Sequence, residues 1–141
     1  MIKVFIQDEA GSYDRNLHNE KTLEYKSTFR ISRPYPYPYG FIIGTSAEDK
    51  DNVDCYVITN ERLKTGTIVE CEPIGLLEQV EDGEVDHKIL AVIPGEDSEL
   101  GEGLLEVFRD FISHVLGKRA SVGRLLPREA ALRHIQAFRD A

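Results

Sequence analysis

Three aspartates, Asp49, Asp51 and Asp54, lie within six residues of one another, in a loop that leads into an apolar run. Carboxylate oxygens are hard ligands, and three of them so close together suit Mg²⁺ or Mn²⁺ better than a soft metal. The spacing does not fit an EF-hand, because Asp54 stands where that loop requires glycine and Asn60 where it requires glutamate. A solvated acidic turn would have the same composition, so the triplet alone leaves both interpretations open.

A second acidic cluster lies between two strand-like runs and is followed by Lys88. Its members are Glu81, Asp82, Glu84 and Asp86. An ordinary charged hairpin would show the same pattern. If the two acidic segments meet in space, however, their mutual repulsion raises the pKa of some of these carboxylates unless a cation binds between them.

Residues 35–42 read Tyr-Pro-Tyr-Pro-Tyr-Gly-Phe-Ile. Pro36 and Pro38 fix the backbone φ angle, so a stiff extended segment is expected there. The large rings of Tyr35 and Tyr39 favour packing of this segment against neighbouring strands.

The elements that must position these residues fall into two groups, strands first and helices last. Six alternating or continuous apolar runs in the first two thirds of the chain predict a set of about five strands. The runs are residues 2–7, 22–32, 41–43, 53–58, 67–80 and 85–93. Pro73 and Gly75 are expected to bend the longest run, as the corners of small barrels require. The segment between the first two runs, residues 8–19, is polar and reads as turns.

Two amphipathic helices are predicted in the last third of the chain. Residues 104–116 carry apolar side chains at helical spacing, and Gly117 follows as a suitable residue to end the helix. A second helix is expected to begin at Pro127, because proline is favoured in the first helical position. The order predicts an α+β fold that is mainly β. We expect a five-stranded, closed or partly open OB-like barrel with two C-terminal helices packed on it, in a single domain over residues 1–141.

Composition excludes several classes of protein. A length of 141 residues suits one domain, and a net charge of -8 with a pI near 5.0 disfavours a protein that binds nucleic acid by neutralising phosphates. Cys55 and Cys71 alternate with polar residues in strand-like runs, so we expect buried thiols in a reducing compartment, the cytoplasm. No apolar stretch is long enough to span a membrane, and the first ten residues do not resemble an export signal.

Taken together, the tyrosine segment, the acidic loop and the later strands resemble the magnesium-dependent inorganic pyrophosphatases of the OB-fold kind. In that family a Tyr-Pro-x-Asn-Tyr-Gly-Phe-Ile segment precedes an Asp-Gly-Asp-Pro-x-Asp loop at the separation found here between Tyr39 and Asp49. The similarity continues through Gly66, residues 71–75 and residues 86–92, and it is clearest between Tyr35 and Val92.

The resemblance implies a role for each matched residue. Asp49, Asp54, Glu81 and Asp86 are expected to hold Mg²⁺, for which Mn²⁺ could substitute. Asp51 is expected to orient or deprotonate the attacking water, with Tyr39 and Lys88 assisting catalysis at the phosphate. The substrate-binding residues are then expected to be Tyr35, Tyr39, Lys88, Lys26 and Arg33. Pyrophosphate or a related phosphoanhydride would be the substrate, and a cytoplasmic homo-oligomer that binds neither nucleic acid nor membrane would be the usual form.

The chain also departs from the family pattern. Phe111 and Ile112 stand where the family carries a Tyr-Lys pair that grips phosphate, and Ser12 falls near the position of another family lysine. Lys50 replaces the glycine of the acidic loop, and Asn52 replaces its proline. Three functions therefore stay open: a pyrophosphatase, a related hydrolase of another phosphorylated compound that a more apolar site would admit, and a binding protein that no longer turns over substrate.

Overall fold

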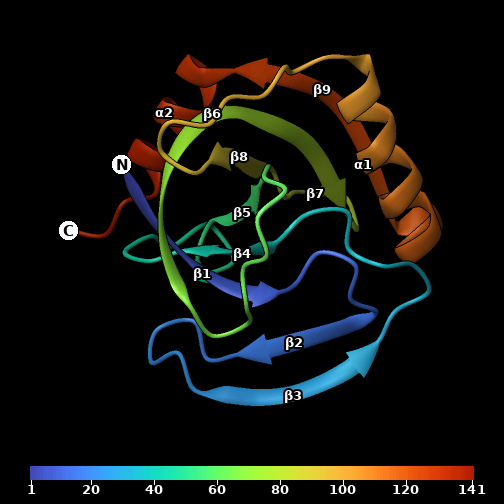
Figure 1. The fold of residues 1–141 in the computed structure, drawn as a ribbon, viewed down its shortest axis with the longest axis horizontal. Helices are drawn as coiled ribbons and strands as arrows, with labels where there is room; N and C mark the ends of the chain where they lie inside the picture. The colour runs from blue at the N-terminus through green and yellow to red at the C-terminus, as the bar shows by residue number, and fades with distance from the viewer.

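Five strands curve into a partly closed barrel in the computed structural model, which describes residues 1–141. They are β1 (Ile2–Asp8), β4 (Tyr39–Ile42), β5 (Asp54–Val57), β8 (Lys88–Val92) and β6 (Ile68–Glu81), in that order. The first part of β6 pairs with β1 and the next part pairs with β8, so the sheet returns on itself. Figure 1 shows β6 sweeping around the other strands of the barrel. All neighbours are antiparallel except β5 and β8, which run parallel.

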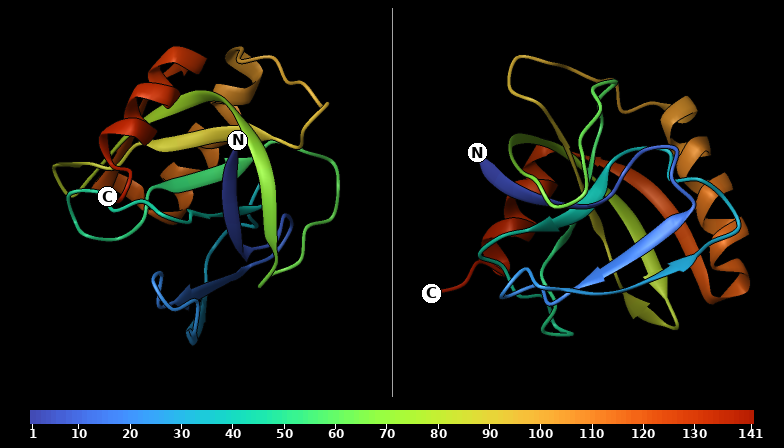
Figure 2. Two further views of the ribbon diagram at one scale, coloured as in Figure 1. Left: turned by 90° about the vertical axis from the view of Figure 1, so that its left-hand side faces the viewer. Right: turned by 60° about the horizontal axis from the view of Figure 1, so that its bottom comes forward.

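The remaining elements surround this barrel. The hairpin of β2 (Asp14–His18) and β3 (Tyr25–Arg30) lies beside it. The short strand β7 (Glu84–Val85) and the longer β9 (Ala120–Pro127) each pair antiparallel with β6. Helix α1 (Glu102–Val115) is followed by a 3₁₀ turn, η1 (Gly117–Arg119), and α2 (Arg128–Ala137) follows β9. Figure 2 shows the two helices on neighbouring sides of the sheet and the β2–β3 hairpin projecting from the opposite end.

Each helix buries its apolar stripe against a different part of the sheet. Ala131 and Ile135 of α2 pack in a cluster with residues of the barrel interior such as Val4 and Ile89. The buried residues of α1 pack instead with the tyrosine segment and with Leu77. Because this second cluster joins α1 to the tyrosines, the helix and the extended segment hold each other in place.

Close approaches of the backbone explain two of the glycines. A Cβ atom on Gly40 would lie 1.8 Å from the carbonyl oxygen of Phe5, so only glycine allows β4 to pair so tightly with β1 at this point. Gly75 follows a shift in the β6–β8 register, and a Cβ atom there would lie 2.8 Å from the carbonyl oxygen of Leu126. The predicted bend of β6 at Pro73 and Gly75 is therefore confirmed.

The predicted fold class is confirmed, but several boundaries differ. Residues 85–93 form two strands rather than one, because the pairing is interrupted at Asp86 and His87. Part of the polar segment 8–19 forms β2, which pairs with β3 as a hairpin. Strand β9 was not predicted at all, and Pro127 ends it as the N-cap of α2 rather than starting the helix. Gly117 follows α1 with a φ of 59°, as expected for the end of that helix.

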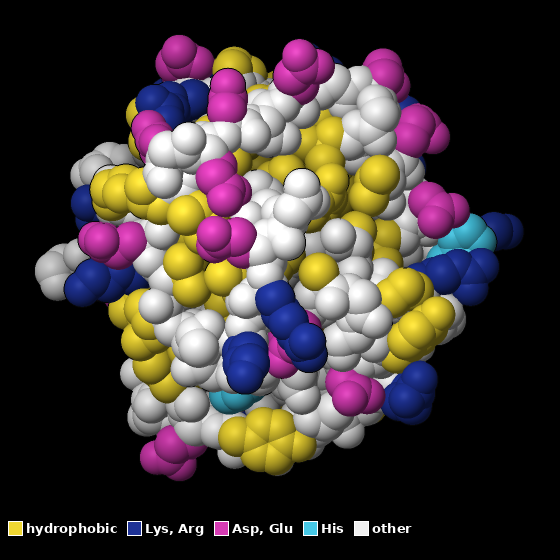
Figure 3. All heavy atoms as spheres, viewed as in Figure 1, with side chains coloured by type: hydrophobic (Ala, Val, Ile, Leu, Met, Phe, Trp, Pro, Cys, Tyr) yellow, Lys and Arg dark blue, Asp and Glu magenta, His cyan; other side chains and the backbone are white.

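The surface agrees with the acidic composition. On the face shown in Figure 3, Lys and Arg side chains are scattered singly or in small groups among Asp and Glu. Neither helix has the length and apolar character that crossing a membrane demands. Cys55 and Cys71 are both free and buried, as the sequence predicted.

Candidate active site

A cavity of about 700 Å³ opens where the tyrosine segment, the acidic loop, β8 and α1 meet. Six carboxylates line it: Glu20, Asp49, Asp51, Asp54, Glu81 and Asp86. Four cationic side chains line it as well: Arg15, Arg30, Lys88 and Arg119. The two acidic segments of the sequence thus do meet in space, together with Tyr35 and Tyr39.

The centre of this charged set is the ammonium group of Lys88. Its Nζ atom donates hydrogen bonds to Asp54 Oδ2 at 2.7 Å, to Asp86 Oδ2 at 3.0 Å and to the hydroxyl of Tyr39 at 3.1 Å. The parallel pairing of β5 with β8 places Asp54 directly opposite Lys88, and the interruption before β8 leaves Asp86 two residues away. A hydrogen bond of 2.9 Å from the Asp86 backbone N–H to the carbonyl of Gln79 fixes this interruption.

Burial makes these charges depend on one another. Burial and the neighbouring Asp86 raise the pKa of the Asp54 carboxyl, although Lys88 acts in the opposite direction. Burial alone would lower the pKa of Lys88, but Asp54, Tyr39 and Asp86 raise it well above its usual value. Lys88 is therefore charged and serves as the counter-ion of two carboxylates in a poorly solvated place.

The acidic loop is built from backbone hydrogen bonds within residues 47–51. The Ala47 N–H donates to the carbonyl of Asp51 at 2.7 Å, and the Asp51 N–H donates to Asp49 Oδ1 at 3.0 Å. Lys50 has a φ of 73°, in the left-handed region that glycine favours. The loop therefore keeps the turn that a glycine would give, even though a lysine occupies the position.

The turn between β2 and β3 anchors this loop from outside. Glu20 Oε1 accepts a hydrogen bond of 2.9 Å from the Asn52 backbone N–H. The Nζ atom of Lys21 donates to Asn52 Oδ1 at 2.5 Å and to Ser46 Oγ at 2.7 Å. Asn52, which stands where the family has proline, is thus part of the contact that positions the acidic loop.

Glu20 was not among the residues that the sequence analysis singled out. Burial, together with the charges of Asp54, Asp51 and Asp49, raises its pKa from about 4.5 to about 7. Its position opposite the acidic loop gives no recognisable signal in the sequence, because the turn that carries it is far from the loop along the chain.

Arg15 is a second functional candidate that the sequence analysis missed. It lies on β2, and its guanidinium donates a hydrogen bond of 3.1 Å to the hydroxyl of Tyr35. Asp8 lies beside the pair, fully buried, with Oδ1 accepting 2.7 Å and 3.1 Å hydrogen bonds from the backbone and side chain of Asn16. Burial raises the pKa of Asp8 to about 6, in spite of the opposing effect of Arg15. If residues 14–18 had been predicted as a strand, Arg15 could have been identified as a candidate for this cavity.

The structure does not bring every predicted residue to the cavity. Lys26 and Arg33 are exposed and are not among the residues that line it. Ser12 is outside it too, in a turn where its hydroxyl accepts a hydrogen bond from the Asp14 N–H. Phe111 and Ile112, by contrast, do line the cavity.

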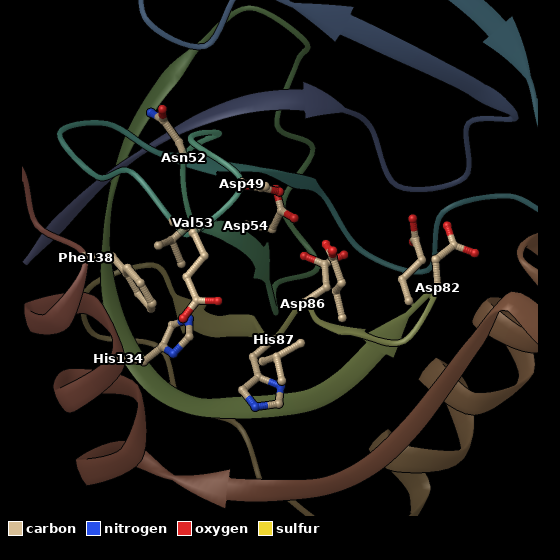
Figure 4. Close-up of a pocket in the computed structure, with 14 residues that line it drawn as sticks. Asp49, Asn52, Val53, Asp54, Asp82, Asp86, His87, His134 and Phe138 are labelled. Atoms are coloured by element: carbon tan, nitrogen blue, oxygen red, sulfur yellow. The ribbon is translucent and has the colours of Figure 1, made fainter.

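A neighbouring cavity of about 590 Å³ shares Asp49, Asp54, Glu81 and Asp86 with the first. Figure 4 shows this second cavity, with Asp54 and Asp86 close together and His134 and Phe138 on another side. The four predicted metal ligands therefore line both cavities.

The donor set fits a divalent cation. The oxygen ligands are hard, and the pKa values of Glu20 and Asp54 are raised in part by neighbouring carboxylates, a repulsion that a cation would relieve. No three His, Cys, Asp or Glu side chains are already gathered tightly enough to form a complete metal site. Lys88 bonds only the Oδ2 atoms of Asp54 and Asp86, so their Oδ1 atoms would be available to a cation.

The fold and the site together define the class of protein: an OB-like barrel with clustered carboxylates and cations at one cavity. Comparison with known proteins then gives the family: the family model for inorganic pyrophosphatase matches residues 6–136, and the chain belongs to that family.

Individual relatives agree with this assignment. An inorganic pyrophosphatase of Nanoarchaeum equitans is 33% identical over 99% of this chain and 96% of its own length. One from a Nostoc species is 38% identical over 69% of this chain, and that match spans only 58% of the relative's length. The crystal structure of an inorganic pyrophosphatase from Neisseria gonorrhoeae superposes with a TM-score of 0.85 at 29% identity, covering 97% of this chain and 88% of that one.

Proposed function

We propose that the protein hydrolyses inorganic pyrophosphate to two phosphates with the help of Mg²⁺. The observation that carries the proposal is the convergence of Asp54, Asp86, Tyr39 and Lys88 within hydrogen-bonding distance at one cavity. Its support from outside the structure is the family membership and the shared name of the relatives.

Asp49, Asp54, Glu81 and Asp86 would hold the cation, and Mn²⁺ offers a substitute with similar ligand preferences. When bound, such a cation supplies charge neutralisation for the phosphates and lowers the pKa of a coordinated water. Asp51 lies in the same loop and is exposed to solvent in the cavity, where its carboxylate can accept the proton of the attacking water.

The phosphate groups would be held by two cationic side chains that line the cavity, the buried Lys88 beside Asp54 and Asp86 and the half-buried Arg15. Lys88 supplies a point charge, and Arg15 supplies a planar group that suits phosphate oxygens. The Tyr39 and Tyr35 hydroxyls, now bonded to Lys88 and Arg15, can donate to the same oxygens. Charge that develops on the leaving phosphate is then met by donors that are already in place.

The first experiment is phosphate release from pyrophosphate at saturating Mg²⁺. Wild type is compared with Asp51→Asn and Asp54→Asn, and with Asp97→Asn, an exposed aspartate outside the cavity, as the matched control. We expect the first two variants to lose at least about a hundredfold in rate and the control to match wild type. Absence of activity in wild type, or equal rates in all four proteins, would overturn the proposal.

We also propose that the protein acts in the cytoplasm as a homo-oligomer. Free buried thiols and family membership support this proposal. Light scattering of the purified protein across a range of concentrations tests the oligomeric state. A single species with the mass of one chain would contradict it.

A further inference from the structure

One side of the active-site cavity is rich in apolar side chains, and we call it the apolar wall. Helix α1 contributes Phe111, Ile112 and Val115 to it, together with the imidazole of His114. Leu116 continues this wall after the helix, and Phe29 and Ile31 extend it from the β3 side. Arg30, between Phe29 and Ile31, and Arg119 line the cavity as well, so the apolar wall is bordered by cations.

The apolar wall begins next to the groups expected to bind phosphate. The Phe111 ring centroid lies 5.1 Å from that of Tyr35, and Tyr35 in turn lies 5.6 Å from Tyr39, the partner of Lys88. On the other side, Phe29 stands directly opposite Arg15 in the β2–β3 ladder. A group attached to a bound phosphate would thus meet Phe29 or Phe111 within a few ångströms of the charged residues.

The size of the cavity fits an organic ligand. About 700 Å³ is within the range of pockets that hold small organic molecules, and a diphosphate anion alone would fill only part of it. Phe29 is 49% exposed, so its ring is accessible to a ligand in the cavity. An apolar surface beside a few converging polar groups is the usual composition of a small-molecule site.

We propose that this cavity also binds and cleaves diphosphate esters of an aromatic or alkyl group, with the organic group against Phe29, Phe111 and Ile112. The proposal rests on the proposed pyrophosphatase function, because the same residues would handle the phosphates. Water would attack the terminal phosphorus, the bond from that phosphorus to the bridging oxygen would break, and the bridging oxygen would leave with the organic monophosphate. One proton of the water is released, so a diphosphate ester and water give an organic monophosphate, inorganic phosphate and that proton.

The test measures binding separately from hydrolysis. Phenyl methylenediphosphonate and methyl methylenediphosphonate, in which a carbon bridge prevents cleavage, are titrated into the protein by calorimetry with Mg²⁺ present. We expect the phenyl compound to bind about tenfold more tightly than the methyl compound, because only the phenyl ring reaches the apolar wall. Phe29→Ser should remove most of this preference, whereas Tyr25→Ser, which changes an exposed aromatic residue of the same strand outside the cavity, should keep it.

Hydrolysis of phenyl diphosphate and of pyrophosphate is then followed by phosphate release. Equal affinities for the two diphosphonates, no binding of either, or a preference that survives Phe29→Ser would overturn the inference. Preferential phenyl binding without cleavage of phenyl diphosphate would overturn its catalytic part. Pyrophosphate hydrolysis without phenyl preference would leave the proposed function standing and reject only the inference, so the two failures are distinguishable.

Discussion

Asp54 and Lys88 lie directly opposite each other on the two parallel strands of the barrel, with 2.7 Å between Oδ2 and Nζ. Lys88 is almost fully buried, and Asp54 is largely so. A buried ion pair costs desolvation energy, and breaking it by removing one partner costs more because the other charge is left alone. The pair therefore ties the stability of the barrel to the charge state of the active site.

Lys88→Met is expected to destabilise the cation-free protein by about 3 kcal/mol, since Asp54 and Asp86 lose their counter-ion in a buried place. Urea unfolding in EDTA measures this loss. Added Mg²⁺ should restore much of it, because a cation can take the place of the ammonium group. Lys64→Met, which changes an exposed lysine, serves as the control. An equal loss in the control, or no recovery with Mg²⁺, would contradict the prediction.

Glu20→Gln is expected to stabilise the cation-free protein at pH 8. The pKa of Glu20 is about 7 in the folded state and about 4.5 in the unfolded state. Between these pH values the folded state keeps the proton that the unfolded state has lost, so the free energy of unfolding falls as pH rises. Above pH 7 the charged carboxylate opposes folding fully, and a neutral amide avoids this cost while still accepting the Asn52 hydrogen bond.

The measurement is urea unfolding in EDTA at pH 4 and pH 8. The gain from Glu20→Gln should be present at pH 8 and almost absent at pH 4, where Glu20 is mostly protonated in both states. Glu24→Gln, which changes a nearby exposed glutamate, should give no gain at either pH value. A gain of the same size at both pH values would mean that charge at Glu20 is not its cause.

Arg15→Ala is expected to lower kcat/KM for pyrophosphate by about tenfold to a hundredfold, the range for losing a hydrogen bond to a charged group. Arg15→Lys keeps a positive charge beside Tyr35 and should lose less. Steady-state phosphate release gives both values, with Arg133→Ala on the exposed face of α2 as the control. If Arg15→Ala behaves as Arg133→Ala does, Arg15 has no contact with the substrate.

How far the sequence predicts this site depends on the distance between its parts along the chain. Asp49, Asp54 and Asp86 were identified because their spacings follow a family motif within continuous stretches. Arg15 was missed because β2 lacks the apolar alternation that marks a strand, and Glu20 was missed because it lies in the turn that follows. Strand β9 was missed for a similar reason, since its glycine and arginine interrupt the pattern and its pairing with β6 is a long-range contact.

Lys50→Gly is expected to stabilise the protein by about 1 kcal/mol, because Lys50 occupies the left-handed region at a φ of 73°, where a Cβ atom is strained. Lys50→Ala retains the Cβ atom and should give no such gain, so it separates backbone strain from the loss of the lysine charge. Urea unfolding of the two variants in EDTA gives the comparison. Glycine also makes the unfolded chain more flexible, which opposes the gain. A Gly variant no more stable than the Ala variant would show that the hydrogen bonds of the acidic loop, and not relief at position 50, set the energy of this turn.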